Sequence, residues 1–152
     1  RLDLIVNTMF KCALQTGEIT VNNPAIWRPI LSIEDASSAY IRAVEANPRI
    51  SGIFNISSGN YTVGEVADLV KAGVEKHFDK PVKLNIKNVQ DFRNYKVDCE
   101  KARKVLSFKP RHDVEAILDQ LAQNLESFKD FDNPAYYNIQ VFKDLVEKRR
   151  VS

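Results

Sequence analysis

Two arginines, Arg28 and Arg93, could bind an anionic ligand. Arg28 directly follows Trp27, and Arg93 lies two residues before Tyr95. A guanidinium is a rigid, planar fork of donors that satisfies two oxygens of one anion and stays charged at every working pH. Each arginine also has an ordinary structural explanation. Arg28 could pair with Glu34 or Asp35, and Arg93 could be a solvated surface side chain.

Four further side chains have competing explanations. Asn7 can donate and accept hydrogen bonds, which suits a hydroxyl or phosphate oxygen, but on an apolar helix it could be a buried spacer. Trp27 could lie beside a planar ligand or anchor the core. Asp35 is explained structurally as the cap of a helix, because a carboxylate there accepts the free amide hydrogens of the first turn. Tyr95 is expected to pack rather than to react.

The elements that would position these residues follow from apolar spacing and turn residues. The pattern predicts helices over about 3–16, 35–47, 62–78, 98–106, 113–128 and 138–149, and strands over 19–21, 28–33, 52–56 and 81–86. Gly17 should end the first helix, Thr62 and Glu65 form a capping-box pattern, and Asp98 and Asp113 are expected N-caps.

The 52–56 segment is a nearly continuous apolar run flanked by turns, which suits a strand covered on both faces, as in a parallel sheet. Helices and strands alternate, so the predicted fold class is α/β. The few short strands are too sparse for a free-standing α/β domain. The chain makes better sense as the second half of a larger α/β protein, with 52–56 completing a sheet that begins upstream.

Several motifs occur in an order that resembles a known family. Residues 27–39 hold an Arg-Pro, a short strand and a small-residue helix start; 54–59 read Phe-Asn-Ile-Ser-Ser-Gly; 91–98 hold an arginine and an aromatic-Lys-Val-Asp; 101–110 end in Leu-Ser-Phe-Lys-Pro. Together they resemble the extended short-chain dehydrogenases/reductases, in the branch of NAD-dependent nucleotide-sugar epimerases and dehydratases. Ser107 replaces the glycine usual in the last motif. The resemblance covers about residues 2–125.

The resemblance implies a fold and a set of roles. The chain would be the C-terminal portion of a Rossmann-type protein with a small mixed α/β substrate-binding domain, over 1–130, followed by a C-terminal helical extension over 131–152. Arg28 and Arg93 match arginines that contact the diphosphate, and Asn7 matches an asparagine near the sugar and diphosphate. Val21 and Trp27 fall where the family places its nucleoside.

Two features of the family are missing from this sequence. It has no Gly-x-x-Gly-x-x-Gly turn to cradle a pyrophosphate and no Tyr-x-x-x-Lys pair for acid–base chemistry. We therefore expect no catalytic and no cofactor-binding residue here. NAD or NADP would belong to a full-length parent, and this fragment would bind none and be inactive alone. Its partners would be a nucleotide-diphosphate sugar and the missing N-terminal Rossmann half, in a parent that could form a homodimer.

Composition and charge argue against several kinds of ligand and location. The charge is +2, from 22 Lys plus Arg against 20 Asp plus Glu, which predicts no binding to nucleic acid or membranes. No apolar run approaches the ~20 residues that span a bilayer, and no leader opens the chain, so a cytoplasmic location is expected. Cys12 and Cys99 are expected to be reduced thiols, and His77 and His112 lack the spacing of metal ligands, so no metal site is predicted.

Three hypotheses remain open. The chain could be the substrate-binding portion of an NAD(P)-dependent nucleotide-sugar epimerase, dehydratase or reductase. It could instead be a non-catalytic module that binds a nucleotide sugar or nucleoside diphosphate. The third alternative is an unrelated small α/β protein with a chance match.

Overall fold

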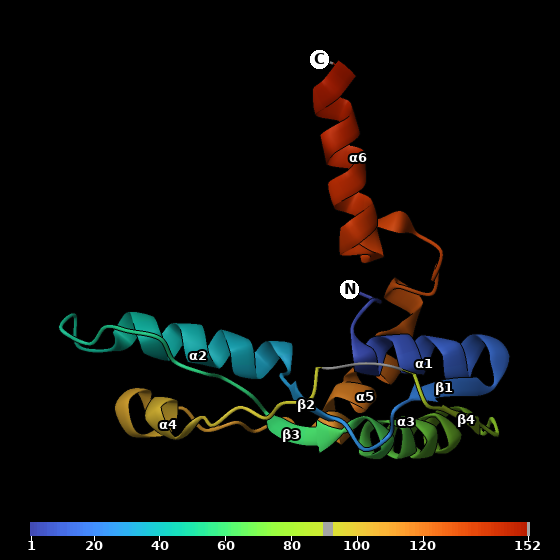
Figure 1. Ribbon diagram of the computed structural model, residues 1–152, viewed down its shortest axis with the longest axis horizontal. Coiled ribbons are helices and arrows are strands. Elements are labelled where there is room, and N and C mark those ends of the chain that lie inside the picture. Colours follow the sequence, from blue (N-terminus) through green and yellow to red (C-terminus); the bar gives the residue numbers. More distant parts are fainter. Residues whose placement is uncertain (90–92, 152) are drawn as a thin grey trace.

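The computed structural model describes residues 1–89 and 93–151 of the 152-residue chain and is built from helices and four short strands (Figure 1). In chain order the elements are α1 (Ile5–Thr16), β1 (Glu18–Asn22), β2 (Trp27–Ile30), α2 (Ile33–Glu45), β3 (Gly59–Thr62), α3 (Val63–Phe78), β4 (Lys83–Lys87), α4 (Glu100–Leu106), α5 (Val114–Gln123) and α6 (Asn138–Val151), with short 3-10 helices at Leu125–Ser127 and Pro134–Tyr136.

The described strands form two separate pairs. β1 and β4 run parallel, with Glu18 opposite Lys83 and Val21 opposite Ile86. β2 and β3 run antiparallel, with Trp27 opposite Thr62. The α/β class is confirmed, and the chain does contain parallel pairing. However, β2 stops at Ile30 rather than at residue 33, and β3 was not predicted as a strand.

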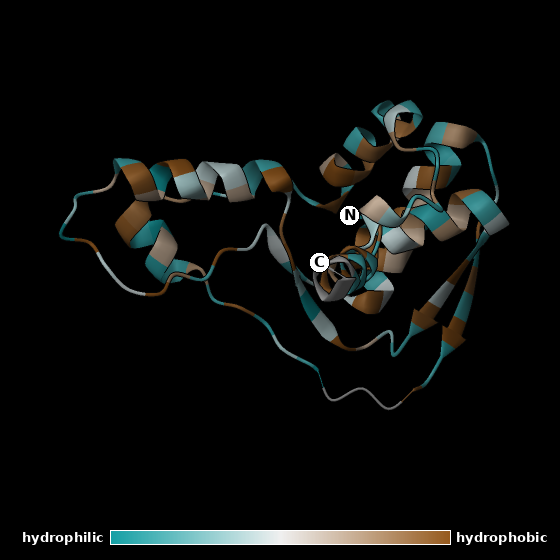
Figure 2. Ribbon diagram, turned by 90° about the horizontal axis from the view of Figure 1, so that it is seen from above, coloured by the Kyte–Doolittle hydropathy of each residue, from teal (hydrophilic) through white to brown (hydrophobic). Residues whose placement is uncertain are grey.

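The main core lies where α1, α3 and α5 pack against each other and against β1. Phe10, Ile19, Val70 and Leu118 are all within 2% of full burial in this cluster. Figure 2 shows these helices gathered on one side of the molecule, and the buried apolar residues that they carry form one cluster. Burial of this kind is the largest favourable contribution to folding, at about 25 cal/mol per Å2 of apolar area.

A second, smaller lobe consists of α2, α4 and the extended segment 52–57, and it projects from the main core (Figures 1 and 2). Its core contains Ala39, Ala102 and Phe108, with Phe54 and Ile56 packed against them. β2, β3 and the loops beside them join the two lobes. This joint is where the candidate site lies.

The prediction of a strand at 52–56 is wrong for this chain. The segment has no strand assignment, and no described strand lies beside it, because β1 pairs with β4 and β2 with β3. A strand needs a neighbour to take its backbone hydrogen bonds. Ile53, expected to be covered, is 87% exposed.

The predicted cap at the end of α1 is confirmed, and the predicted cap at the start of α2 is wrong. Gly17 ends α1 in the left-handed conformation, with φ of 72°, as predicted. Asp35 is not the N-cap of α2, and that prediction is wrong. Ser32 caps the helix instead, because its Oγ accepts the Asp35 N–H at 3.0 Å. The Asp35 carboxylate can therefore accept hydrogen bonds from residues outside the first turn of α2.

The remaining caps are mostly as expected. Thr62 and Glu65 form the predicted capping box, and the Thr62 N–H holds the pKa of the Glu65 carboxyl below its usual range. Asp113 caps α5, although that helix ends at Gln123, short of residue 128. Asp98 is one residue too early to be the N-cap of α4, so this prediction is wrong, although its Oδ1 accepts the Glu100 N–H at 2.7 Å.

Ser107 stands at the C-terminus of α4 with φ of 53°, in the left-handed region that glycine adopts without strain. We therefore expect Ser107→Gly to stabilise the protein by about 0.5–1 kcal/mol, because relief of left-handed strain exceeds the added chain entropy of glycine. Urea unfolding measures this change, and Ser107→Ala is the control, because alanine keeps the strain. A glycine variant no more stable than the alanine variant contradicts the prediction.

The predicted C-terminal helix is present as α6, which stands away from the body (Figure 1). The segment before it is tied to the start of the chain, since the Leu2 N–H donates to Tyr136 O at 2.8 Å. Lys11 Nζ donates to the Tyr137 hydroxyl at 3.0 Å, which raises the pKa of Lys11. The domain boundary at residue 130 stays a prediction. No described helix is long and apolar enough to cross a bilayer.

Candidate functional site

Arg28 and Arg93, 65 residues apart in sequence, meet at the joint between the lobes. Arg28 projects from β2, and its Nη1 donates to the carbonyl oxygens of Trp27, at 2.8 Å, and of Arg93. One guanidinium therefore contacts the backbone that carries the other. The structure brings together the two predicted arginines.

Two aromatic rings and a further cation complete this cluster. Lys96 Nζ lies 3.4 Å from the centre of the Trp27 ring, and the Arg28 guanidinium carbon lies 5.9 Å from the centre of the Tyr95 ring. The Trp27 ring is half-buried, and Arg93, Tyr95 and Lys96 are exposed. Cations beside aromatic faces at a surface suit a ligand that combines negative charge with a planar ring.

Val21 and Asn7 have different surroundings. The Val21 side chain is 1% exposed and belongs to the main core, so only its backbone can face a ligand. Asn7 lies on α1, and its Nδ2 donates to Arg1 O at 2.6 Å. Asn7 is thus already used as a local hydrogen-bonding group, although it is half-buried rather than buried as the alternative explanation proposed.

Asp35 is the buried polar centre of the joint, and only 1% of its surface is exposed. Its carboxylate accepts from Ser58 Oγ at 2.7 Å, from the Arg111 N–H at 2.9 Å, and from the His112 N–H and Nδ1 at 3.2 and 3.1 Å. Because an ionised carboxylate only accepts, Nδ1 must carry the ring proton. Burial opposes the charge, but these hydrogen bonds outweigh it and keep the Asp35 pKa below its usual value.

Asp35 therefore links α2 to the turn before β3 and to the loop before α5. Ser58 continues the network, because its Oγ also accepts the Ser32 N–H at 3.0 Å. The prediction that Asp35 is structural rather than chemical is consistent with this geometry. The helix-cap explanation given for it was wrong.

A dinucleotide fits poorly to the helix ends of this chain. The first turns of α2, α3 and α5 each carry acidic side chains, and each N-terminus is already capped by a residue of its own. α1 follows Leu4 rather than a glycine turn. A pyrophosphate needs free amides at a positive helix end. The N-terminal ends of these four helices do not fit that group.

Cys12, Cys99 and Tyr61 are further reactive side chains, and Tyr61 lies opposite Arg28 in the β2–β3 pair. Cys12 and Cys99 are both free, and burial raises the pKa of the Cys99 thiol. Burial, followed by the Asp113 charge, raises the pKa of Tyr61. Within residues 1–89 and 93–151, no group of His, Cys, Asp and Glu side chains is placed to hold a metal ion.

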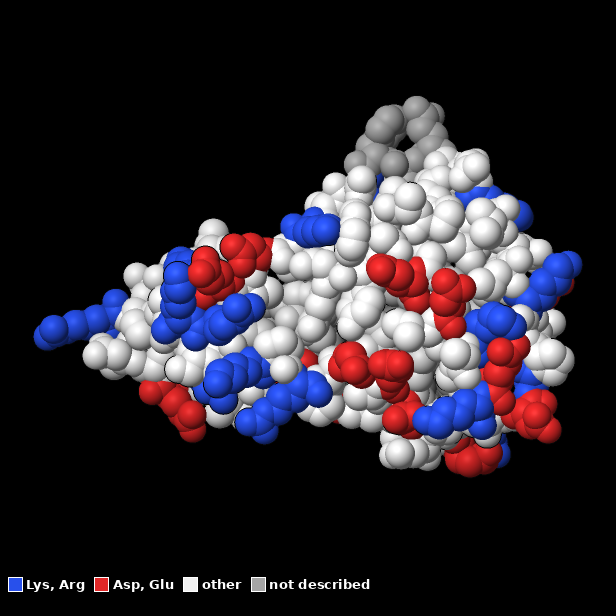
Figure 3. All heavy atoms as spheres, turned by 90° about the horizontal axis from the view of Figure 1, so that it is seen from below, with Lys and Arg blue, Asp and Glu red and all other residues white. Residues whose placement is uncertain are grey.

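On the face seen in Figure 3, Lys and Arg gather over the second lobe, whereas acidic and basic side chains are interspersed over the main lobe. Lys101 and Lys104 of α4 each have a polar partner. Lys101 Nζ donates to Ile53 O at 2.8 Å, and Lys104 pairs with Glu100 at 2.8 Å.

Several residues in or beside the cluster were not predicted as site residues. Lys96 and Asn94 flank Tyr95, and neither has a sequence feature of its own that indicates a binding role. Asn60 lies in a segment expected to be a turn, and its partner Val97 is 37 positions away. Only the aromatic-Lys-Val-Asp pattern around Lys96 marked this stretch, and it pointed to the arginine before it.

No protein-family model and no curated protein matches the chain in sequence. Among solved structures, epimerase Mth375 from Methanothermobacter thermautotrophicus aligns with a TM-score of 0.71 and 14% identity, over 86% of this chain and 39% of its own. UDP-glucuronic acid 4-epimerase from Bacillus cereus, in complex with UDP-glucuronic acid and NAD, aligns with a TM-score of 0.69 and 19% identity, over 84% and 41%.

A third structure is dTDP-glucose 4,6-dehydratase from Bacillus anthracis in complex with NAD, with a TM-score of 0.66 and 20% identity, over 85% of this chain and 41% of its own. The chain thus spans about two fifths of the length of the proteins it matches. At these identities the likeness establishes the fold. The chain has the fold of one part of the extended short-chain dehydrogenases/reductases, the Rossmann-type family of nucleotide-sugar epimerases and dehydratases.

Proposed function

We propose that this chain is the substrate-binding part of an NAD(P)-dependent nucleotide-sugar epimerase or dehydratase, and that it binds the nucleoside diphosphate at the Arg28–Arg93 cluster. The observation that carries the proposal is the meeting of Arg28 with the Arg93 backbone beside Trp27 and Lys96. The positive charges of Arg28, Arg93 and Lys96 suit a diphosphate, which carries about two negative charges with paired acceptor oxygens.

Each residue has a distinct role in the proposal. Arg28 and Arg93 bind the diphosphate, and Lys96 adds a third cation. The Trp27 ring offers a face to the nucleobase, which must displace the Lys96 ammonium that lies over it in the present structure. Val21 contributes its backbone. Asn7 is the weakest member, because it would have to give up its bond to Arg1.

Catalysis is proposed only for a larger assembly. In it, a Rossmann half would supply the dinucleotide site, the Tyr-x-x-x-Lys pair and the remaining sheet. The solved structures in complex with NAD match this chain over only about two fifths of their length, which leaves room for such a half. The present chain would bind the substrate and position it, and positioning of that kind is a large part of catalysis.

The outer face of α2 is the surface proposed to meet this partner. Ile33, Tyr40 and Val44 lie on one face of the helix and are 73, 76 and 85% exposed. An exposed apolar surface of this kind is typical of a protein interface. The unpaired segment 52–56 lies in the same lobe and offers a further edge.

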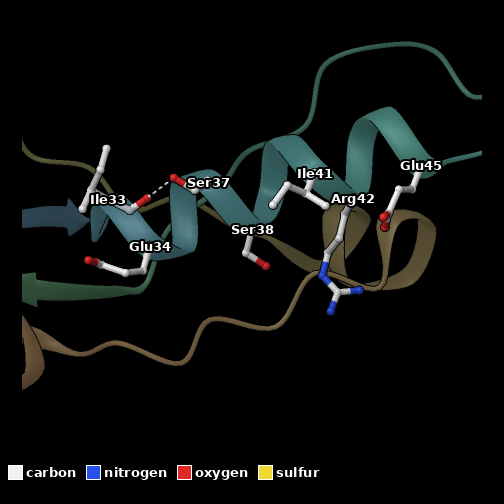
Figure 4. Close-up of a pocket in the computed structure, with 7 residues that line it drawn as sticks. All are labelled: Ile33, Glu34, Ser37, Ser38, Ile41, Arg42 and Glu45. Carbon is white, nitrogen blue, oxygen red and sulfur yellow. Dashed lines mark hydrogen bonds between the residues drawn. The ribbon is translucent and has the colours of Figure 1, made fainter.

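A shallow groove of about 470 Å3 runs along α2 beside that apolar face. Figure 4 shows Glu34, Ser38 and Arg42 pointing to the same side of the helix. Among the described residues, Glu34 Oε2 and Arg42 Nε are buried without a hydrogen-bond partner. Buried polar atoms are normally paired, so a partner with complementary polar groups suits this groove.

Trp27 is the chain's single tryptophan, so its fluorescence reports on the proposed site directly. We expect UDP to change the Trp27 emission in a saturable manner, because the base would replace a cation over the ring. Uridine is the control, since it has the base without the diphosphate and should bind more weakly. UDP that causes no saturable change, confirmed by calorimetry, overturns the proposal.

The same titration with NAD tests whether the cofactor site lies outside this chain. We expect no tight NAD binding by this chain. Tight binding would remove the proposal that the cofactor site belongs to another half.

A further inference from the structure

Asparagine side chains tie the loop that carries Arg93 to the β2–β3 sheet. On one side of Tyr95 and Lys96, Asn94 Oδ1 accepts a hydrogen bond from the Trp27 N–H at 2.8 Å. Residues 93–96 are all exposed, so little apolar burial fixes their position. Hydrogen bonds and cation–ring contacts must do so instead.

Asn60 of β3 makes the link on the other side of Lys96, and it bonds the Val97 backbone in both directions. Its Nδ2 donates to Val97 O at 2.9 Å, and its Oδ1 accepts the Val97 N–H at 2.9 Å. Residues on neighbouring antiparallel strands exchange this same reciprocal pair through their backbones. Here a side chain replaces the strand, because an amide offers an acceptor and donors on one planar group.

Asn23, next to β1, repeats the arrangement at the beginning of the loop. Its Nδ2 donates to Val89 O, and its Oδ1 accepts the Val89 N–H at 2.9 Å. Its own N–H donates to Lys87 O at 2.8 Å. Two asparagines, one just after β1 and one in β3, thus hold the chain at residues 89 and 97.

We infer that Asn60 is a positioning residue of the site: by holding Val97 against β3, it keeps the backbone of residues 93–96, and with it Arg93, beside Arg28. The ligand part of this inference rests on the proposed function, and the loop-holding part does not. A site ordered before binding loses less conformational entropy when the ligand arrives, so the Asn60 bonds favour affinity without touching the ligand.

The loop-holding part is tested without ligand. In Asn60→Ala we expect the Val97 amide hydrogen to exchange about tenfold faster or more, because exchange follows the opening of the local hydrogen bond. The Val70 amide in α3 should not change. The Trp27 emission should also change as Lys96 leaves the ring. Unchanged exchange and unchanged emission overturn the inference.

Asn55→Ala is the matched control, because Asn55 also reaches this loop, but through one long bond of 3.4 Å to Asp98 O. We expect it to alter neither readout. Asn60→Asp keeps the acceptor for the Val97 N–H and loses the donor, so it should restore part of the protection. A control variant that matches Asn60→Ala in both readouts also overturns the inference.

The ligand part uses a double-mutant cycle on UDP binding. Asn60→Ala should weaken binding about three- to tenfold, and it should have little further effect once Arg93 is alanine, because coupled residues are not additive. Full additivity overturns the positioning role. If wild-type protein binds no UDP while the Val97 exchange still depends on Asn60, the proposed function fails and the loop-holding role stands.

Discussion

Asp35→Ala is expected to lower the free energy of unfolding by about 3–5 kcal/mol, because the substitution leaves buried donors without their charged acceptor. Four hydrogen bonds end on this carboxylate, from Ser58, Arg111 and His112. These donors belong to the turn before β3 and to the loop before α5. Urea unfolding followed by circular dichroism measures the loss.

Glu34→Ala is the matched control for this prediction. Glu34 is the neighbouring acidic residue in the first turn of α2, but it makes no comparable set of bonds, and its removal should cost less than about 1 kcal/mol. Equal stability losses in the two variants would show that Asp35 contributes only a helix-end charge.

The Asp35 pKa also predicts the direction of a pH effect. Its folded-state pKa lies below the ordinary value of 3.8, so the carboxylate contributes stability that is fully present above that value. That contribution is lost as the pH falls through the folded pKa. The stability difference between wild type and Asp35→Asn should therefore be constant from pH 5 to 7 and shrink below about pH 3.8. A difference that grows on acidification contradicts this sign.

Arg28→Ala is expected to weaken UDP binding roughly ten- to 150-fold, which corresponds to about 1.5–3 kcal/mol for a charge-assisted hydrogen bond. Arg93→Ala should have an effect of similar size. Calorimetry is the measurement of choice, because Arg28 contacts Trp27 O and its removal could alter the fluorescence itself. Arg28→Lys should fall between, since it keeps the charge and loses the planar fork.

Arg42→Ala is the matched control, because it removes the same charge from α2, outside the cluster. We expect it to leave UDP affinity within about twofold, as long-range charge effects are screened at physiological salt. Each variant must keep its wild-type melting behaviour for the comparison to hold. Unchanged affinity in both Arg28→Ala and Arg93→Ala would remove the assigned site.

Local patterns predicted most of the helices. Gly17 and Thr62 with Glu65 were predicted correctly because a cap needs only a few consecutive residues. The errors arose where two neighbouring residues could perform the same role. Ser32 rather than Asp35 caps α2, and Cys99 rather than Asp98 precedes α4. The sequence presents both residues of each pair, and only the backbone path chooses between them.

The strand prediction at 52–56 failed for a different reason. Its apolar run is typical of a sheet covered on both faces, but a strand exists only beside another strand, and the described chain provides none there. β3 was missed because Gly59 and Asn60 are typical turn residues. Pairing with β2 overrides that preference, as tertiary context often does for short strands.

The sequence by itself determined the α/β class, most helix positions and the family resemblance, since these depend on residue type and spacing along the chain. It also identified Arg28, Arg93 and Trp27 as candidates. Only the tertiary structure decided that Arg28 meets the Arg93 backbone, that Lys96 covers Trp27, and that Asn60 holds Val97. These contacts join segments 37 to 69 residues apart, and hydrogen-bond geometry between such segments exists only after the chain has folded.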